Sequence, residues 1–292
     1  MDDMPLDPQI RTLFGGGETL PALPTSAEGM REFYRARELP GQKVSQVASV
    51  VDRSIPGPGG RLTIRVYEPF GAGPFPLILA FHGGGWVAGN LDSYDVGARN
   101  LCAGVPAVVA SVDYRLAPEH RFPAATEDCL AALRWAAEHA RELGAEAARI
   151  AVAGDSAGAN LAAVTALRAR DEGGPRLAGQ LLVYPVTAHH SLGTRSYTQN
   201  AKGYLLTREV MEFFWVSYLG HPNHPRDAHA APLEAPDLRG LPPAMIVTAE
   251  FDPLRERGRG IRPSASGGGR ACGDPALRRY DPRLFQSGRN RG

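Results

Sequence analysis

Residues 149–164 read RIAVAGDSAGANLAAV, and this stretch decides the fold. An apolar run, 150–153, leads into Gly154-Asp155-Ser156-Ala157-Gly158, which fits the pattern G-x-S-x-G, and a helix-forming segment follows directly. A serine on such a strand-to-helix turn is lifted out of the sheet, and the flanking glycines let neighbouring backbone approach closely. We therefore predict Ser156 as a nucleophile. The alternative, a Gly/Ser turn without chemistry, does not explain the strand and helix on either side.

Further apolar runs surround this stretch and predict the rest of a sheet. Short continuous runs of this kind are typical of strands buried on both faces of a parallel sheet. Helical patterns rich in Ala, Leu, Arg and Glu separate several of them, which predicts an α/β fold with a mostly parallel sheet and helices on both faces. The runs cover residues 76–81, 107–110, 150–153, 181–184 and 245–247, and the helical patterns cover 124–143 and 157–170.

Two segments do not fit the strand–helix alternation. Residues 1–50 mix short amphipathic pieces with Gly and Pro, and about 187–235 form a long insertion that contains a helical pattern at 208–215. Long insertions at the carboxyl edge of a sheet usually serve a site. We expect both segments to form a helical cap on a core of residues 51–256. The alternative is a packed surface excursion with no lid role.

The segment His82-Gly83-Gly84-Gly85-Trp86 directly follows the strand predicted at 76–81. Three glycines leave backbone N–H groups unobstructed, so that two of them can point at one oxyanion. We expect Gly83 and Gly84 to donate, together with the N–H of Ala157. The expected role of His82 is structural, orienting the loop through hydrogen bonds. A phosphate loop is disfavoured, because no Gly-Lys-Ser/Thr follows.

Bulk properties narrow the class of protein. The 292 residues are 43% hydrophobic and 22% charged, which is enough to bury one large core. A formal net charge of +1 gives no reason to expect nucleic acid or an anionic membrane as a partner. Three separated cysteines without metal spacing indicate a reducing compartment. With no readable signal peptide or transmembrane span, we expect a cytoplasmic protein.

At this point the residues resemble a known family, the hormone-sensitive-lipase-like esterases of the α/β-hydrolase fold, in the branch with the motif GDSAG. The resemblance covers roughly 45–256 and includes HGGGW, GDSAG and the segments 113–119, 122–125, 241–244 and 250–255. It implies an eight-stranded sheet, a helical cap, no metal or organic cofactor, and hydrolysis of short-chain acyl esters. Related enzymes often pair through the last strand, so a homodimer is compatible with the resemblance.

The resemblance maps the acid of the catalytic triad onto Asp252, which lies just past a predicted buried strand. A carboxylate there can hold an imidazole in the required tautomer. The alternative role of Asp252 is to cap a helix ahead of Pro253. The chain order Ser, Asp, His is the one this fold uses, yet no histidine follows Asp252. The family's final helix, last strand and histidine are therefore not readable in this sequence.

The segment 257–292 is unlike the rest of the chain. It holds nine arginines, eight glycines and two aspartates, a net charge of +7, without regular periodicity. This composition is typical of disorder or of a basic arm. The same composition, rich in Arg, Gly, Pro, Ala and Ser, also results when a GC-rich gene is translated in the wrong reading frame. Read one base later, permitted codons spell Glu-Gly-Glu-Ala-Tyr-Ala from Arg257 and Gly-Met-Ile-His-Gly-Phe-Phe from Arg279. We therefore expect a frameshift near codon 256.

Several functions stay open on this basis. The favoured one is a serine hydrolase of small acyl esters, and a deacetylase or amidase of a small acylated metabolite would share its acyl-enzyme chemistry. A non-catalytic ligand binder is the second class, since plant gibberellin receptors resemble the same family and lack the histidine. A third alternative takes its base from His189 or His190, which follow the strand predicted at 181–184.

Overall fold

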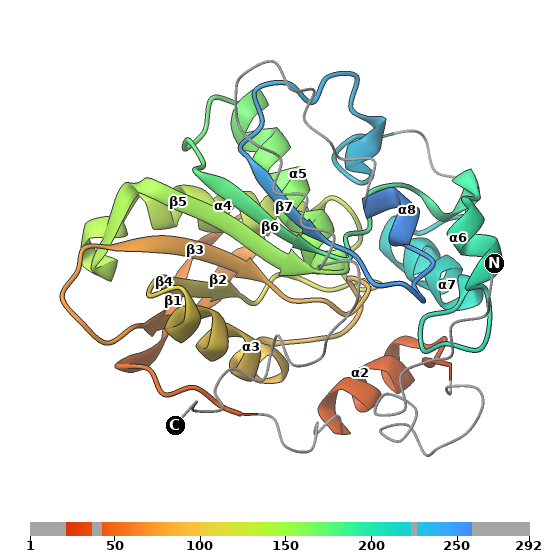
Figure 1. The fold of residues 1–292 in the computed structure, drawn as a ribbon, viewed down its shortest axis with the longest axis horizontal. Coiled ribbons are helices and arrows are strands. Elements are labelled where there is room, and N and C mark those ends of the chain that lie inside the picture. The colour runs from red at the N-terminus through yellow and green to blue at the C-terminus, as the bar shows by residue number, and fades with distance from the viewer. Residues whose placement is uncertain (1–21, 37–42, 223–226, 259–292) are drawn as a thin grey trace, which may run out of the picture.

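The computed structural model of the protein describes residues 22–36, 43–222 and 227–258. Within them a seven-stranded sheet has the order β1-β2-β4-β3-β5-β6-β7 (Figure 1). The pairs β1–β2 and β2–β4 are antiparallel, and the neighbours from β4 to β7 are parallel, which confirms the mostly parallel sheet. The strands are β1 (Ser49–Gly57), β2 (Gly60–Glu68), β3 (Phe75–Phe81), β4 (Val108–Val112), β5 (Ala145–Asp155), β6 (Gly179–Val183) and β7 (Ala244–Val247).

Helices cover the sheet on both faces, as expected. The helices α4 (Ala124–Glu138) and α5 (Ala157–Asp171) share one large buried cluster with Leu77 and Leu79 of β3. On the opposite face, α3 (Leu91–Gly104) packs with the alternate strand positions, such as Ile78. Because successive side chains of a strand point to opposite faces, both sets must be apolar. This explains why the strands are continuous apolar runs.

Two elements in contact with the sheet, β1 and α3, were not predicted from the sequence. The strand β1 lies at the edge of the sheet and exposes most of its side chains, so it lacks the apolar run of a central strand. The helix α3 buries only three side chains and contains a glycine, so its apolar periodicity is weak. A capping box between Asn90 and Ser93 marks its start and was readable in principle.

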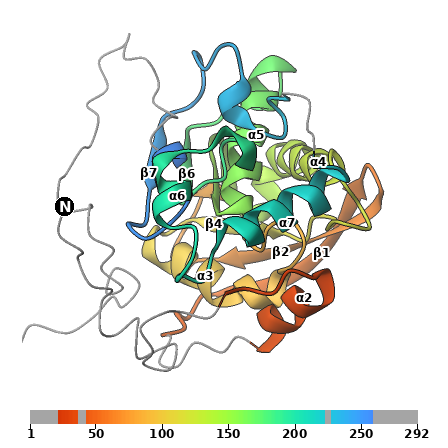
Figure 2. The same cartoon turned by 90° about the vertical axis from the view of Figure 1, so that its right-hand side faces the viewer.

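Four helices lie beyond the carboxyl ends of the parallel strands, as Figures 1 and 2 show. Among them, α7 buries five side chains in the main core, so it is firmly packed and its role as a lid stays a prediction. Three short 3-10 helices, η1 (Ala140–Leu143), η2 (His190–Leu192) and η3 (Pro232–Glu234), complete the described structure. The four helices are α2 (Ala27–Ala36), α6 (Arg195–Gln199), α7 (Arg208–Leu219) and α8 (Arg255–Gly258).

The strand β7 forms one edge of the sheet and pairs only with β6 within the described ranges. Its Met245 side chain is 55% exposed, so this end of the sheet is incompletely covered there. The expectations for the tail concern residues almost all of which lie outside the described ones. In the part of the chain that is described, no helix has the length and apolar character to cross a membrane.

Candidate active site

Ser156 lies at the sharp turn between β5 and α5, where the sequence predicts it. Its backbone has a φ of 54° and a ψ of −117°, a conformation that L-residues rarely adopt. Such strain costs of the order of 1–3 kcal/mol and persists only where the surrounding structure imposes it. Two hydrogen bonds tie this turn to β6 and the loop after it: Ser156 N–H donates to the Val183 carbonyl, and Val186 N–H donates to the Ser156 carbonyl.

The glycines around Ser156 are required by close backbone contacts. A Cβ atom at Gly158 would lie 2.0 Å from the carbonyl oxygen of Phe81, and one at Gly154 would lie 2.4 Å from the backbone of Gly158. Real Cβ atoms do not approach backbone atoms so closely, so larger residues would force β3, β5 and α5 apart. We call residues 154–158 the nucleophile turn.

Residues 82–89 form the oxyanion loop, which lies against the nucleophile turn. Gly84 and Gly85 have φ values of 120° and 62°, in the region that favours glycine. Their N–H groups, and that of Ala157 at the first position of α5, bond to no residue that the structure describes. The amino end of a helix also favours negative charge. Three backbone donors are therefore available to an oxyanion beside Ser156.

The structure revises one expected donor, Gly83. Its N–H donates to Oδ1 of Asp155 at 2.8 Å, so it is already occupied. An N–H group with a carboxylate partner cannot also serve a substrate oxyanion. The N–H groups still available near Ser156 are therefore those of Gly84, Gly85 and Ala157. The pattern of glycines alone could not show this, because the partner of Gly83 lies 72 residues away.

His82 has the contacts of a structural residue. Its ring is 2% exposed, stacks on Tyr114 with centroids 4.3 Å apart, and has Nδ1 2.8 Å from the carbonyl oxygen of Gly83. Tyr114 in turn donates to the His82 carbonyl at 2.6 Å. Burial lowers the pKa of His82 to about 4, so the imidazole is neutral. These contacts support its expected role in orienting the loop.

Asp252 lies after β7 and is only 9% exposed. Burial raises the pKa of its carboxyl to about 7, against smaller lowering effects from the Leu254 N–H and Arg255. The Leu254 N–H donates to Oδ1 at 2.8 Å, which is the capping contact that the alternative role of Asp252 predicts. The chain is further held by Asn200, whose Nδ2 donates to the Asp252 carbonyl. The carboxyl is thus fixed, buried and incompletely solvated.

The sheet brings Ser156 and Asp252 to the same edge. The register aligns Asp155 with Val183 and Val183 with Val247, so β5 and β7 end level with β6 between them. Two strand spacings separate β5 from β7 by about 10 Å. Ser156 and Asp252 therefore both follow strands that end at the same carboxyl edge of the sheet, where the partners of a catalytic triad come together in this type of fold.

The aromatic residues of α7 form the back of the oxyanion loop. A Cβ atom at Gly85 would lie 2.1 Å from the Phe214 ring, and Trp86 lies 4.9 Å from Trp215, centroid to centroid. Trp86, Phe214 and Trp215 are all at most 4% exposed. Their packing places α7 directly behind the loop. The sequence predicts the helix but not this contact, because nothing in it links the two segments.

His189 and His190 lie in the loop after β6, and their contacts are with the cap. His189 is 7% exposed, its ring meets that of Trp215 at 4.9 Å, and its Nδ1 is 2.8 Å from the Ser191 hydroxyl. The two imidazoles lie 4.2 Å apart. His189 thus packs on α7 and bonds to its own loop, which favours a structural role over that of a replacement base.

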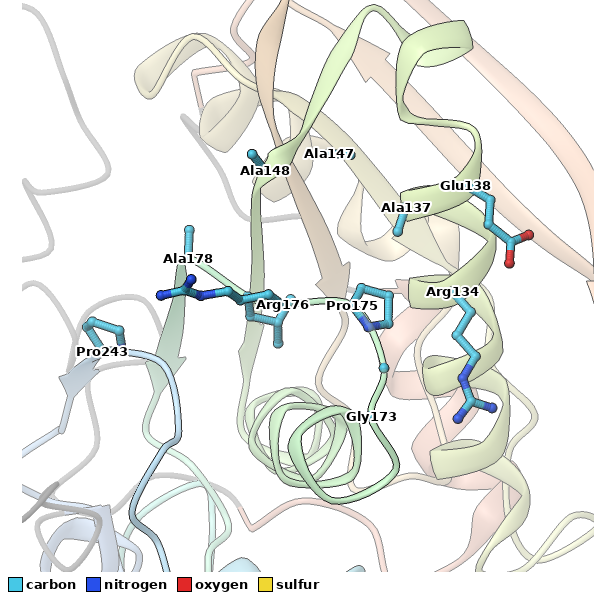
Figure 3. A pocket seen from close by; sticks show the side chains of 12 residues that line it. Arg134, Ala137, Glu138, Ala147, Ala148, Gly173, Pro175, Arg176, Ala178 and Pro243 are labelled. Carbon is cyan, nitrogen blue, oxygen red and sulfur yellow. The ribbon is translucent and has the colours of Figure 1, made fainter.

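A cavity of about 1010 Å³ opens at the other edge of the sheet, shown in Figure 3. Arg134 and Glu138 of α4, Ala148 of β5 and Pro243 before β7 line it. These strand positions mark the amino ends of β5 and β7, whereas Ser156 follows the carboxyl end of β5. The cavity is therefore separate from the candidate active site.

Comparisons with known proteins agree with this fold. A family profile described as the alpha/beta hydrolase fold matches residues 78–272. The chain is 47% identical over 228 residues to Esterase LipI of Mycobacterium tuberculosis, covering 77% of this chain and 71% of that protein. It is 43% identical over 265 residues to Carboxylesterase NlhH of the same species, covering 87% and 80%.

Solved structures show the same likeness. A hyperthermophilic esterase from the archaeon Pyrobaculum calidifontis superposes with a TM-score of 0.81 at 39% identity, covering 88% of this chain and 83% of that one. The thermostable carboxylesterase EstE1, from a metagenomic library, gives 0.77 at 44% identity, covering 80% and 81%. The chain therefore belongs to the hormone-sensitive-lipase-like carboxylesterase family of α/β hydrolases.

Proposed function

We propose that the protein hydrolyses short-chain acyl esters through an acyl-enzyme on Ser156. The serine Oγ attacks the ester carbonyl carbon, its proton passes to a base, and a tetrahedral oxyanion forms. Collapse of this intermediate expels the alcohol and leaves the acyl group on Oγ. Water then attacks the acyl-enzyme and releases the acid. The strained turn at Ser156, between β5 and α5, is the observation that carries the proposal.

The oxyanion would be held by the N–H groups of Gly84, Gly85 and Ala157. Donors of this kind act without reorganisation because the loop is packed before substrate arrives. Removing one of them typically costs about 3 kcal/mol of transition-state stabilisation. The buried contacts behind Gly84 and Gly85, with the Ala88 carbonyl and the Phe214 ring, supply this rigidity.

We assign Asp252 as the acid that orients the histidine, and we place that histidine in the reading frame one base later than the printed residues 257–292. Its codon would straddle Pro282 and Arg283. The level ends of β5 and β7 support this proposal, because they bring Ser156 and Asp252 to the same edge of the sheet. A peptide map of the natural protein that contains Met-Ile-His-Gly-Phe-Phe would support the shift, and one that contains the Arg/Gly-rich tail would contradict it.

Phosphonate labelling separates the hydrolase from a ligand binder. In the natural protein an activated serine forms a stable phosphonyl adduct, and peptide mapping should place it on Ser156 and find none in Ser156→Ala. A binder's serine would stay unlabelled. Ester and amide substrates share the acyl-enzyme path, so parallel assays with p-nitrophenyl acetate and an N-acetyl anilide decide between esterase and deacetylase.

The same proposal includes the protein's partners, location and oligomeric state. The substrate is a small acyl ester, with no nucleic acid or membrane as partner, and we propose a cytoplasmic location. The homodimer that the resemblance allows is tested by sedimentation of the natural protein, where a single species of monomer mass would contradict it.

A further inference from the structure

The carboxylate of Asp155 joins the two halves of the candidate active site. It accepts the N–H of Gly83 at 2.8 Å. Asp155 immediately precedes the nucleophile Ser156, and Gly83 immediately precedes the donor Gly84. The bond therefore links the two segments one residue away from each reacting group.

This hydrogen bond extends the pairing of two neighbouring strands. In the parallel register of β3 and β5, the last aligned pair is Phe81 and Gly154. Beyond this pair the chain of β3 leaves the sheet, whereas Asp155 still pairs with Val183 of β6, so β3 and β5 have no further aligned backbone pair. The Asp155 side chain takes over at this point, since its Oδ1 reaches the Gly83 amide that a continuing strand would have bonded through its backbone.

Gly83 and the Asp155 carboxylate are also closely packed against each other. A Cβ atom at Gly83 would lie 2.4 Å from Oδ2 of Asp155, so a residue with any side chain could not keep this loop position. Gly83 is buried, so loss of the carboxylate would take away the acceptor that its N–H has in the structure. A bond to an ionised acceptor is also stronger than one between neutral groups. The charge of this carboxylate also acts on Tyr94. Burial is the larger cause that raises the pKa of the Tyr94 phenol, and the charge of Asp155 is the second.

We propose that Asp155 is a positioning residue, which fixes the oxyanion loop to the nucleophile turn so that Gly84 and Gly85 are in place when Ser156 is acylated. The inference rests on the proposed function for its catalytic part. Asp155 touches neither substrate nor the reacting atoms. Its loss should slow the acylation step while leaving ground-state binding of the acyl compound unchanged, because the loop can then move away from the developing oxyanion.

Hydrogen exchange tests the link itself, without requiring any reaction. In the full chain, Asp155→Ala should speed exchange of the Gly83 amide, followed in a peptide covering 82–86, by about tenfold. Asp155→Asn keeps an oxygen acceptor and should restore most of the protection. Asp237→Asn removes a carboxylate that pairs at the surface with Arg239, and it should change nothing in this peptide. Unchanged exchange in Asp155→Ala would overturn the proposal.

Phosphonate inactivation tests the consequence for chemistry. In the chain read one base later after codon 256, which carries the proposed base, Asp155→Ala should lower the maximal rate of Ser156 modification by a p-nitrophenyl alkylphosphonate by up to about a hundredfold. The concentration for half-maximal rate should stay the same, and Asp155→Asn should recover most of the rate. Faster exchange with an unchanged maximal rate would reduce Asp155 to a structural residue and overturn its positioning role.

The two measurements separate this inference from the proposed function. If the chain with the shifted frame and an intact Asp155 does not label at Ser156, the proposed function fails and the catalytic part of the inference fails with it. The exchange result still decides whether the link exists. If that chain labels and both Asp155 variants match it in rate, only the inference fails. Circular dichroism of both variants shows that each is folded.

Discussion

The indole of Trp86 stacks on the phenol ring of Tyr218, with centroids 4.3 Å apart and the ring planes 6° from parallel. Trp86 directly follows the glycines of the oxyanion loop, and Tyr218 belongs to the last turn of α7. Both side chains are fully buried. The insertion between β6 and β7 thus packs against the oxyanion loop and supports it.

Tyr218→Ala should destabilise the protein and slow phosphonate labelling of Ser156. Truncating a buried aromatic side chain typically costs about 3–5 kcal/mol in unfolding free energy. The matched control is Tyr218→Phe, which keeps the stacked ring. The Tyr218 hydroxyl has no hydrogen-bond partner among the described residues, so its removal should be nearly neutral. Urea denaturation measures both, and equal losses in the two variants would contradict the stacking account.

The buried carboxyl of Asp252 should make stability depend on pH. Its pKa is raised by burial to about 7, whereas an unfolded Asp titrates near 4. Below pH ~4 the Asp252 carboxyl is protonated in both the folded and the unfolded chain, and the free energy of unfolding has its highest value with respect to this group. As pH rises from ~4 to ~7, the unfolded chain ionises first, so the free energy of unfolding falls, by up to about 4 kcal/mol.

The variant Asp252→Asn isolates this effect, because an amide does not titrate. Denaturant midpoints at several pH values should show a decline for the unmodified chain between pH 4 and 7 and a flatter profile for the variant. Parallel profiles for the two proteins would contradict a raised pKa at Asp252.

Gly158→Ala should prevent proper formation of the nucleophile turn. The added Cβ would lie 2.0 Å from the Phe81 carbonyl and 2.6 Å from the His82 carbonyl, both rigid backbone atoms. We expect insoluble protein or a loss of more than about 3 kcal/mol in unfolding free energy. Gly104→Ala is the control, since nothing lies within 4 Å of its Cβ position. Thermal unfolding of the two variants gives the comparison, and similar melting temperatures would contradict the close packing.

Arg31 should hold α2 against the body of the protein. Its guanidinium donates to the carbonyls of Val87 and Ala117 and pairs with both carboxylate oxygens of Glu119. Because Glu119 is half-exposed, the ion pair itself contributes little, and the two carbonyl contacts matter more.

Arg31→Ala should therefore speed hydrogen exchange in 27–36 and cost roughly 1–2 kcal/mol in unfolding free energy. Glu119→Gln, which removes only the charge, should cost less than about 0.5 kcal/mol. The reverse order of the two variants in a denaturant titration would show that the ion pair, and not the backbone contacts, fixes α2.

The features of the fold and the site that were predictable from the sequence are those that adjacent residues encode. The nucleophile turn is a run of adjacent residues with a strand before it and a helix after it, so Ser156 could be placed without a structure. The central strands were equally readable, because both of their faces are buried. Edge strand β1 was missed for the opposite reason, since its side chains are mostly exposed.

The features that were missed depend on contacts between distant segments. The sequence shows three equivalent glycines after His82, and only the Asp155 side chain distinguishes Gly83 from the two donors. Likewise, Phe214 and Gly85 are 129 positions apart in the sequence. Only the folded chain shows that the Phe214 ring leaves no space for a side chain at position 85. Composition and periodicity carry no information about such pairs.

The most direct test compares ester hydrolysis by two chains: the printed sequence, and the same gene read one base later after codon 256. Each is assayed with p-nitrophenyl acetate, alone and with Ser156→Ala. The account predicts that the shifted chain is faster by about a thousandfold or more, because it regains the base that completes the triad, and that Ser156→Ala abolishes this gain. Equal rates in the two chains, or a gain that survives Ser156→Ala, would contradict it.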